Sequence, residues 1–216
     1  MDQPLSLSEK ILLLSVRPEK GGFLFATQGV LDYAVTGALI LDLVMAGNLR
    51  FEVGKLVLNS SHTDVPAGGY LLERIAKVGS PKTSGYWLKS ILLSRSKIRK
   101  LVLDQLVGKR EVRLESRRFL FFTWNVAFLR SGHQATRIIA EIRSTLMRGN
   151  GTEEQLYFIS LLEPNRLLRR VYPEGCERRK ARQRIKATVT ANQVSVALRN
   201  VVQAANAFAA LGHSRS

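Results

Sequence analysis

Side chains that commonly perform acid–base, nucleophilic or metal chemistry are few and widely separated in this sequence. The three histidines, His62, His133 and His213, lack the HExxH or HxH spacing that brings two imidazoles onto one metal ion. The single cysteine, Cys176, lies in a basic stretch that could lower the pKa of its thiol, but a structural thiol near a helix start is the simpler interpretation. These residues predict no metal site and no thiol catalysis.

The remaining candidates for catalysis also favour a structural interpretation. Asp32 and Asp42 lie within an apolar stretch, where capping or pairing with a basic side chain explains them better than proton transfer. The glycine pairs at 21–22 and 68–69 are not followed by the Gly-Lys-Ser/Thr of a phosphate-binding loop, and the GxGxxG and GxSxG motifs are missing. The sequence therefore predicts a protein that is not an enzyme and that uses no cofactor.

Charge is the most informative property of the chain. Lys and Arg total 33 against 17 Asp and Glu, which gives a net charge of +16. Residues 95–118 and 163–187 each contain nine basic and three acidic residues, so these two segments hold 12 of the 16 net charges. Such clustering favours a polyanionic partner, either nucleic acid or an anionic membrane, and charge alone does not separate the two. Ordinary solvated helix faces are the alternative interpretation.

Basic residues at the start of the first segment have the spacing of a phosphate-binding helix face. Arg95 and Arg99 are four residues apart, so a helix places them on one face, with Lys97 and Lys100 close by. A guanidinium holds a phosphate through two hydrogen bonds, and each cation near an anionic leaflet contributes about 1 kcal/mol. We therefore predict that these residues bind lipid headgroups.

An aromatic segment follows the same basic region. Trp124, Val126 and Phe128 are spaced by two, so a strand places all three side chains on one face. Trp favours the headgroup level of a bilayer because its ring is apolar and its N–H is polar. A hairpin that carries this face between arginines is typical of a membrane-inserting wedge, and a face that packs inward is the equally good alternative.

Length and cysteine content limit the class of protein. A chain of 216 residues suits one large domain, and one cysteine allows no intrachain disulfide, which fits a cytosolic compartment. The longest apolar stretch, 31–47, is interrupted by Asp32, Thr36 and Asp42 and is short for a membrane span. Residues 1–10 lack the pattern of a signal peptide. A membrane contact, if made, is therefore peripheral.

Periodicity predicts a mainly α fold, a single compact helical domain over 1–216 with one or two small β-hairpins. The stretch 31–46 is apolar nearly all round, which is typical of a helix at the centre of a fold. Further helices are expected at 11–16, 70–78, 86–93, 98–107, 133–147, 156–162, 166–172, 177–188 and 192–211. Alternation with period two predicts hairpins over 49–58 and 111–129.

Several stretches resemble the Golgi phosphoprotein 3 family of peripheral membrane proteins. Residues 5–14 are similar to the family's opening helix, and 31–51 to its central helix and the following turn. Residues 71–75, 119–122 and 156–184 fall in the family's order. The resemblance covers nearly the whole chain and rests on a dispersed pattern. It implies a helical domain with a projecting hydrophobic hairpin and a basic pocket for phosphatidylinositol 4-phosphate beside it.

The family's pocket uses a Trp and three Arg, and the resemblance carries these positions onto this chain. They fall near Thr27, at Thr36, at Arg99 and near Ser96, which Arg95 precedes. Only Arg99 keeps the family's residue type, so the resemblance implies general binding of anionic lipid more firmly than recognition of one phosphoinositide.

The working hypothesis is a cytoplasmic, peripheral membrane protein that binds anionic lipid, on the cytosolic face of the Golgi if the source is eukaryotic. It allows an adaptor role in membrane trafficking, with a protein cargo, and self-association. A basic nucleic-acid-binding protein that uses 166–186 is the alternative.

Overall fold

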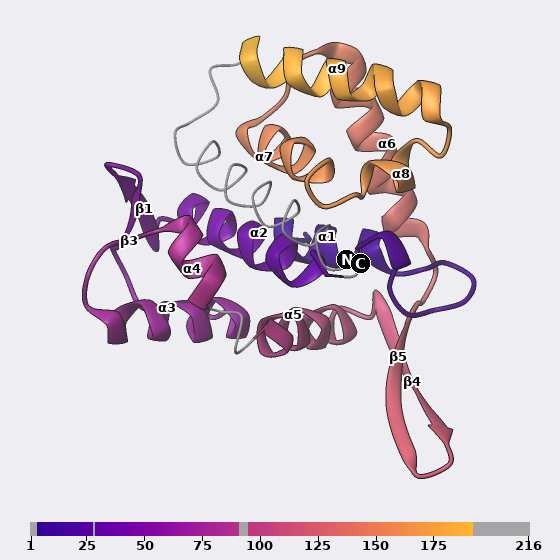
Figure 1. The fold of residues 1–216 in the computed structure, drawn as a ribbon, viewed down its shortest axis with the longest axis horizontal. Helices are drawn as coiled ribbons and strands as arrows, with labels where there is room; N and C mark the ends of the chain where they lie inside the picture. Colours follow the sequence, from indigo (N-terminus) through magenta and orange to yellow (C-terminus); the bar gives the residue numbers. More distant parts are fainter. Residues whose placement is uncertain (1–3, 28, 91–94, 192–216) are drawn as a thin grey trace.

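The computed structural model describes residues 4–27, 29–90 and 95–191, and this part of the chain is mainly α-helical, as predicted (Figure 1). Helices and strands occur in the order α1 (Leu7–Ser15), the 3₁₀ turn η1 (Phe25–Thr27), α2 (Leu31–Met45), β1 (Leu49–Glu52), β2 (Lys55–Leu58), α3 (Pro66–Val78), β3 (Lys82–Thr83), α4 (Ser84–Ser90), α5 (Arg95–Gly108), β4 (Val112–Phe119), β5 (Phe122–Leu129), α6 (His133–Arg148), α7 (Glu153–Leu162), α8 (Leu168–Val171) and α9 (Gly175–Ala191). The helix expected over 192–211 lies outside the described residues.

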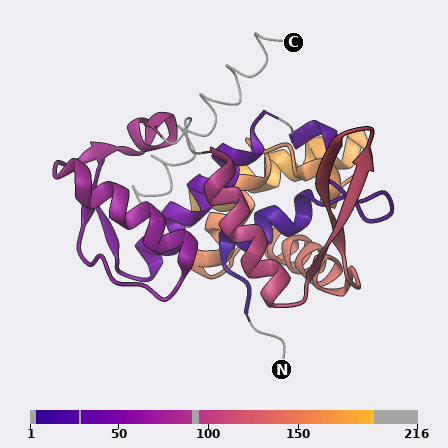
Figure 2. The ribbon, with the colours of Figure 1, turned by 90° about the horizontal axis from the view of Figure 1, so that it is seen from below.

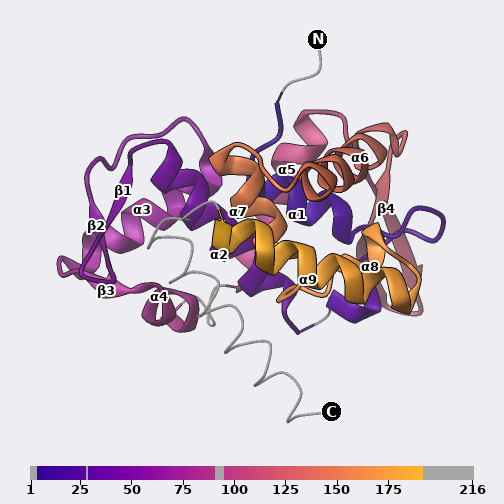
Figure 3. The same cartoon turned by 90° about the horizontal axis from the view of Figure 1, so that it is seen from above.

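Helices α1 and α2 form the central layer of a single domain. Figure 1 shows α3 and α5 below them and α6 to α9 above them, and Figure 3 shows α9 as the outermost element of the upper layer. Leu31–Met45 is buried on almost every side, which explains why its sequence is apolar all round. One continuous hydrophobic core therefore joins the three layers.

The beginning of α1 is held by acidic and basic side chains of neighbouring helices. Asp42 of α2 accepts hydrogen bonds from the Leu7 N–H (2.8 Å), the Ser8 N–H (3.0 Å) and the Ser8 hydroxyl (2.7 Å). Glu9, which is 1% exposed, pairs with the Lys109 ammonium at the end of α5 at 2.7 Å. Three helices are thereby fixed at one junction.

A small sheet covers one end of the central layer. Strands β1 and β2 form the first predicted hairpin, and β3 extends it to the order β1-β2-β3. Helix α3 begins at Pro66, four residues before the predicted start at Tyr70. Proline fits the first turn of a helix because its missing N–H needs no partner there.

The second predicted hairpin, β4–β5, projects from the opposite end of the domain (Figures 1 and 2). Its register pairs Val112 with Leu129 at the base and Phe119 with Phe122 at the tip, so Leu120 and Phe121 form the turn. Eight paired residues give the ribbon a length of about 26 Å. Its outer half extends well beyond the helical layers.

The loop after α1 anchors the base of this hairpin. The Gly22 N–H donates to the Ala127 carbonyl of β5 at 2.7 Å, and the Arg17 N–H closes the loop onto the Gly22 carbonyl at 2.8 Å. At Gly21 (φ +63°) an added Cβ would lie 2.4 Å from the Phe128 ring. The ring therefore occupies the space that any side chain at this position would need.

We expect Asp42→Asn to lower the free energy of unfolding by about 2–3 kcal/mol, because an amide accepts at only one of the two oxygen positions and leaves a buried donor of Ser8 unpaired. Urea denaturation measures this loss, and Asp64→Asn at an exposed carboxylate is the matched control.

Burial raises the pKa of Asp42 above its ordinary value of 3.8, against the opposing effect of its hydrogen bonds. Protonation of Asp42 therefore contributes to the free energy of unfolding at pH values below its ordinary pKa. This contribution is lost as the pH rises through the pKa of Asp42 in the folded protein. The deficit of the variant should therefore be larger in acid than at neutral pH.

We expect Gly21→Ala to destabilise the protein by about 1–3 kcal/mol more than Gly79→Ala. Both glycines have a positive φ (+63° and +66°), but a Cβ at Gly79 would meet nothing within 4 Å. The comparison separates backbone strain from the collision with Phe128. Hydrogen exchange of the β5 amides should accelerate only in Gly21→Ala, and equal effects of the two variants would show that the loop does not anchor the hairpin.

Candidate functional site on the hairpin

Large apolar side chains are exposed together at the end of the β4–β5 hairpin. The exposed fractions are 66% for Leu120, 92% for Phe121, 72% for Phe122 and 47% for Trp124. We call these four residues the apolar tip. Soluble surfaces scatter such residues singly, and a contiguous group on a projecting element is typical of a contact site.

The turn of the apolar tip is not built for stability. Leu120 adopts a left-handed backbone conformation (φ +53°), which two-residue hairpin turns normally give to Gly, Asn or Asp. A bulky L-residue in this region costs about 1–2 kcal/mol. The chain carries Leu-Phe where a glycine at the first turn position would fold more easily, so local stability does not explain the side chains at this turn.

Arginines of β4 lie next to the apolar tip. Arg117 is paired with Trp124 and Arg118 with Thr123 across the ribbon, and both arginines are exposed. Nearer the base, Arg113 is also exposed and pairs with Glu115 at 2.5 Å. We call Arg113, Arg117 and Arg118 the arginine collar. The collar and the tip share one projecting element, with Arg118 nearest the turn and the Arg113 and Arg117 guanidinia over the Phe128 ring toward the base.

The sequence predicted the face of β5 correctly, but not which part of it is exposed. Trp124, Val126 and Phe128 lie on one face, as their spacing required. Trp124 is exposed, Val126 is half-buried, and Phe128 is buried below the Gly21 loop with Arg113 and Arg117 5.3 and 5.6 Å from its ring centroid. The expectation that Phe128 inserts is therefore corrected: this ring holds the hairpin base.

The turn residues were not among the predicted site residues. The run 119–122 carries three aromatic residues and a leucine, and it lies between two alternating strands. An apolar run at the position of a hairpin turn, which is normally polar, is the signal that identifies an exposed tip.

Of the predicted headgroup-binding cations of α5, Lys97, Arg99 and Lys100 lie in different surroundings, and the side chain of Arg95 lies outside the described residues. The Arg99 guanidinium lies 3.0 Å from the Asp32 carboxylate and over the Phe23 ring at 5.6 Å, so it faces the start of α2. Lys97 lies over the Tyr70 ring of α3 at 4.5 Å. Lys100 is exposed, and Arg95 is the first residue of the helix. The carboxylate beside Arg99 also reduces its attraction for a phosphate.

Thr27 and Thr36, the other two positions carried over from the resemblance, are each only 1% exposed. The Thr27 hydroxyl donates to the Leu24 carbonyl at 2.8 Å. Thr36 lies one turn after Asp32 on α2, and its hydroxyl oxygen has no hydrogen-bond partner in the described part of the chain. Neither side chain is presented to a ligand at the surface, because packing of η1 and α2 covers both.

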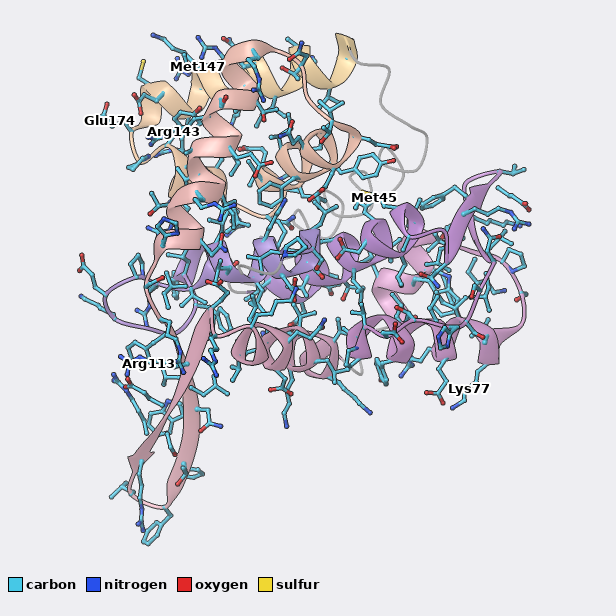
Figure 4. All side chains as sticks on the ribbon, turned by 180° about the vertical axis from the view of Figure 1, so that it is seen from behind. Met45, Lys77, Arg113, Arg143, Met147 and Glu174 are labelled. Atoms are coloured by element: carbon cyan, nitrogen blue, oxygen red, sulfur yellow. The ribbon has the colours of Figure 1, made fainter. Side chains whose placement is uncertain are left out.

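The second basic segment lies away from the hairpin. It forms α8 and α9, with Arg179, Lys180 and Arg184 exposed on α9. Figures 1 and 4 show α9 in the upper layer, while the hairpin extends from the lower side of the domain. The two basic segments therefore lie in different layers of the domain.

The described residues contain no group of three His, Cys, Asp or Glu side chains placed to hold a metal ion. Cys176 is exposed at the start of α9. Within the same residues, every helix is too short or too polar to cross a bilayer.

A comparison with curated proteins finds no match to the chain. A model of the family described as Golgi phosphoprotein 3 matches residues 7–205, from the first residue of α1 to beyond the end of α9. The match covers more than nine-tenths of the chain and agrees with the resemblance in the sequence. The chain therefore belongs to the Golgi phosphoprotein 3 family.

Proposed function

We propose that this protein is a non-enzymatic peripheral membrane protein that inserts the apolar tip into the interface of an anionic bilayer while the arginine collar binds lipid phosphates. The observation that carries the proposal is the exposed group Leu120, Phe121, Phe122 and Trp124 at the end of a projecting, arginine-flanked hairpin. Family membership supports the proposal, because the proposed inserting element is the projecting hairpin that the resemblance to the family implies.

The energies of the two contacts are comparable, so each should be needed. Full burial of a Phe side chain contributes about 1.5–3 kcal/mol, and Phe121 and Phe122 start 92% and 72% exposed. Each arginine near an anionic leaflet adds about 1 kcal/mol. Tip and collar together reach the range of stable but reversible membrane binding, which one signal alone does not.

In this proposal the arginine collar binds the anionic headgroups, and the cations of α5 contribute less to this binding. Arg99 keeps the family's residue type but shares its charge with Asp32, and Thr27 and Thr36 are buried. We therefore propose binding of acidic lipids in general, with phosphatidylinositol 4-phosphate as one of them. Vesicles with phosphatidylserine, phosphatidylglycerol or cardiolipin at equal charge are the comparison that tests this preference.

An adaptor role at a Golgi membrane is the wider form of the proposal. A protein held by the hairpin would keep α9 and its exposed cations turned to the solvent, where a cargo could bind. The same helix is the surface that the nucleic-acid hypothesis would use. Both hypotheses predict sensitivity to salt, so variants that separate α9 from the hairpin decide between them.

Replacing the apolar tip should weaken membrane binding without unfolding the protein. We expect Phe121→Ser with Phe122→Ser to weaken binding to phosphatidylglycerol-containing vesicles at least about tenfold, because two exposed rings no longer enter the bilayer. Vesicle co-sedimentation measures the loss. Met147→Ser is the matched control, since this side chain is 77% exposed on α6, away from the hairpin. Unchanged binding of the double Phe variant would reject the tip as the inserting element.

Neutralising the collar should have a separate electrostatic effect. We expect Arg117→Gln with Arg118→Gln to weaken binding to anionic vesicles about tenfold or more and to flatten its dependence on salt. Arg179→Gln with Lys180→Gln on α9 is the control. Loss of vesicle binding in the α9 variant alone would reverse the proposed orientation. If the wild type binds duplex DNA but not vesicles, and the α9 variant loses the DNA binding, the nucleic-acid hypothesis is favoured.

A further inference from the structure

A groove with a mixed polar and apolar lining lies between α3, α4 and the start of α5, at the end of the domain away from the hairpin. It has a volume of about 520 Å³, and the side chains that define its chemistry are Tyr70, Glu73, Arg74, Lys77, Trp87 and Lys97. Figure 4 shows Lys77 on the lower side of the domain, at the opposite end from Arg113 of the collar. Neither the apolar tip nor the collar contributes to this groove.

The groove carries a surplus of positive charge. Arg74, Lys77 and Lys97 contribute three cations, and Glu73 contributes one anion, which leaves a net charge of +2. The Glu73 carboxylate accepts a hydrogen bond from the Lys77 ammonium at 2.6 Å. This bond, with the charges of Lys77 and Lys97, lowers the pKa of Glu73, so the single anion is ionised at neutral pH and the net charge of the groove there is +2.

The cations are held in place by tyrosine. Lys97 lies 4.5 Å from the centroid of the Tyr70 ring, and the Arg74 guanidinium lies 5.8 Å from it. Arg74 also donates a hydrogen bond to the Tyr70 hydroxyl at 3.0 Å. Lysine and arginine side chains normally lose conformational entropy on binding, and these contacts reduce that loss in advance.

A buried donor without a partner lies in the wall of the groove. Trp87 is 1% exposed, and its indole N–H makes no hydrogen bond within the described residues. An unpaired N–H of this kind costs about 1–3 kcal/mol, and buried indoles usually find an acceptor. The N–H is closed to solvent in the structure, so a ligand oxygen in the groove would remove this cost once the Trp87 ring turns toward it.

We propose that this groove is a binding site for a phosphomonoester, with Arg74, Lys77 and Lys97 around the phosphate and the Trp87 indole as a further donor. A phosphomonoester carries a charge of about −1.5 to −2 at neutral pH and three acceptor oxygens, which matches a site of net +2 that is rich in donors. A phosphodiester or a carboxylate carries one charge and fits less well. The phosphate could belong to a small soluble molecule or to a lipid headgroup such as phosphatidic acid.

The proposal does not rest on the membrane-binding role of the hairpin, and its test needs no membrane. Titration of the full chain with glycerol 3-phosphate should shift the indole ¹H–¹⁵N resonance of Trp87 and leave that of Trp124, the second tryptophan, in place. Dimethyl phosphate at the same concentration should shift neither. Absence of a selective Trp87 shift at millimolar glycerol 3-phosphate would overturn the proposal.

Lys97→Gln should weaken glycerol 3-phosphate binding at least tenfold, because it removes a cation of the groove from an exposed helix position. Lys100→Gln, three residues later on the exposed side of α5, is the matched control and should bind like the wild type. An equal loss in both variants would mean general charge attraction and would also overturn the site.

A vesicle experiment identifies the source of the phosphate. In the Phe121→Ser, Phe122→Ser variant, binding of glycerol 3-phosphate should persist, which keeps failure of the hairpin proposal distinct from failure of this one. If Lys97→Gln weakens binding to phosphatidic acid vesicles more than to phosphatidylglycerol vesicles of equal charge, the groove reads a lipid. If Lys97→Gln weakens only glycerol 3-phosphate binding, the groove binds a soluble phosphomonoester.

Discussion

The first backbone amides of α1 are buried between helices, where water cannot satisfy them. Leu7 and Ser8 are 0% and 2% exposed, so the Asp42 carboxylate is the acceptor that makes this helix start tolerable. The position of α1 fixes the loop that follows it, and that loop fixes the base of the hairpin through Gly21 and Gly22. Through this chain of contacts, the buried Asp42 carboxylate helps to set the direction in which the β4–β5 hairpin leaves the domain.

An isolated two-stranded ribbon is marginally stable in water, which makes the anchoring of the hairpin necessary. The base has buried contacts at Val112, Ala127 and Phe128, while the outer strands and the turn have few. Stability is therefore concentrated where the ribbon leaves the domain. The tip can retain a strained Leu120 and exposed rings because the base supplies the free energy that the tip does not.

Local sequence patterns predicted the helices and strands, but contacts between residues far apart in the sequence determine which side chains of the candidate site are exposed. The periodicity of 31–46 and the alternation of 111–129 depend on neighbours in sequence, and each is present in the structure. The partner of Arg99 is Asp32, and the cover of Phe128 is Gly21, both far away along the chain. A period of two identifies the face of a strand but not its distance from the domain. For this reason the pattern predicted the face that Trp124 and Phe128 share, but not that Trp124 is exposed and Phe128 buried.

Within the described residues the β4–β5 sheet has two strands, so each strand has one edge that no further strand covers, apart from the Ala127 carbonyl, which accepts from the Gly22 N–H. Such edges are templates on which a strand of another molecule can add, and the aromatic run at the tip would strengthen the resulting stack. Arg113, Arg117 and Arg118 place like charges along one of these edges and oppose that addition. The arginines therefore also act as gatekeepers against aggregation, and their protection should fade in concentrated salt, where the repulsion between ribbons is screened.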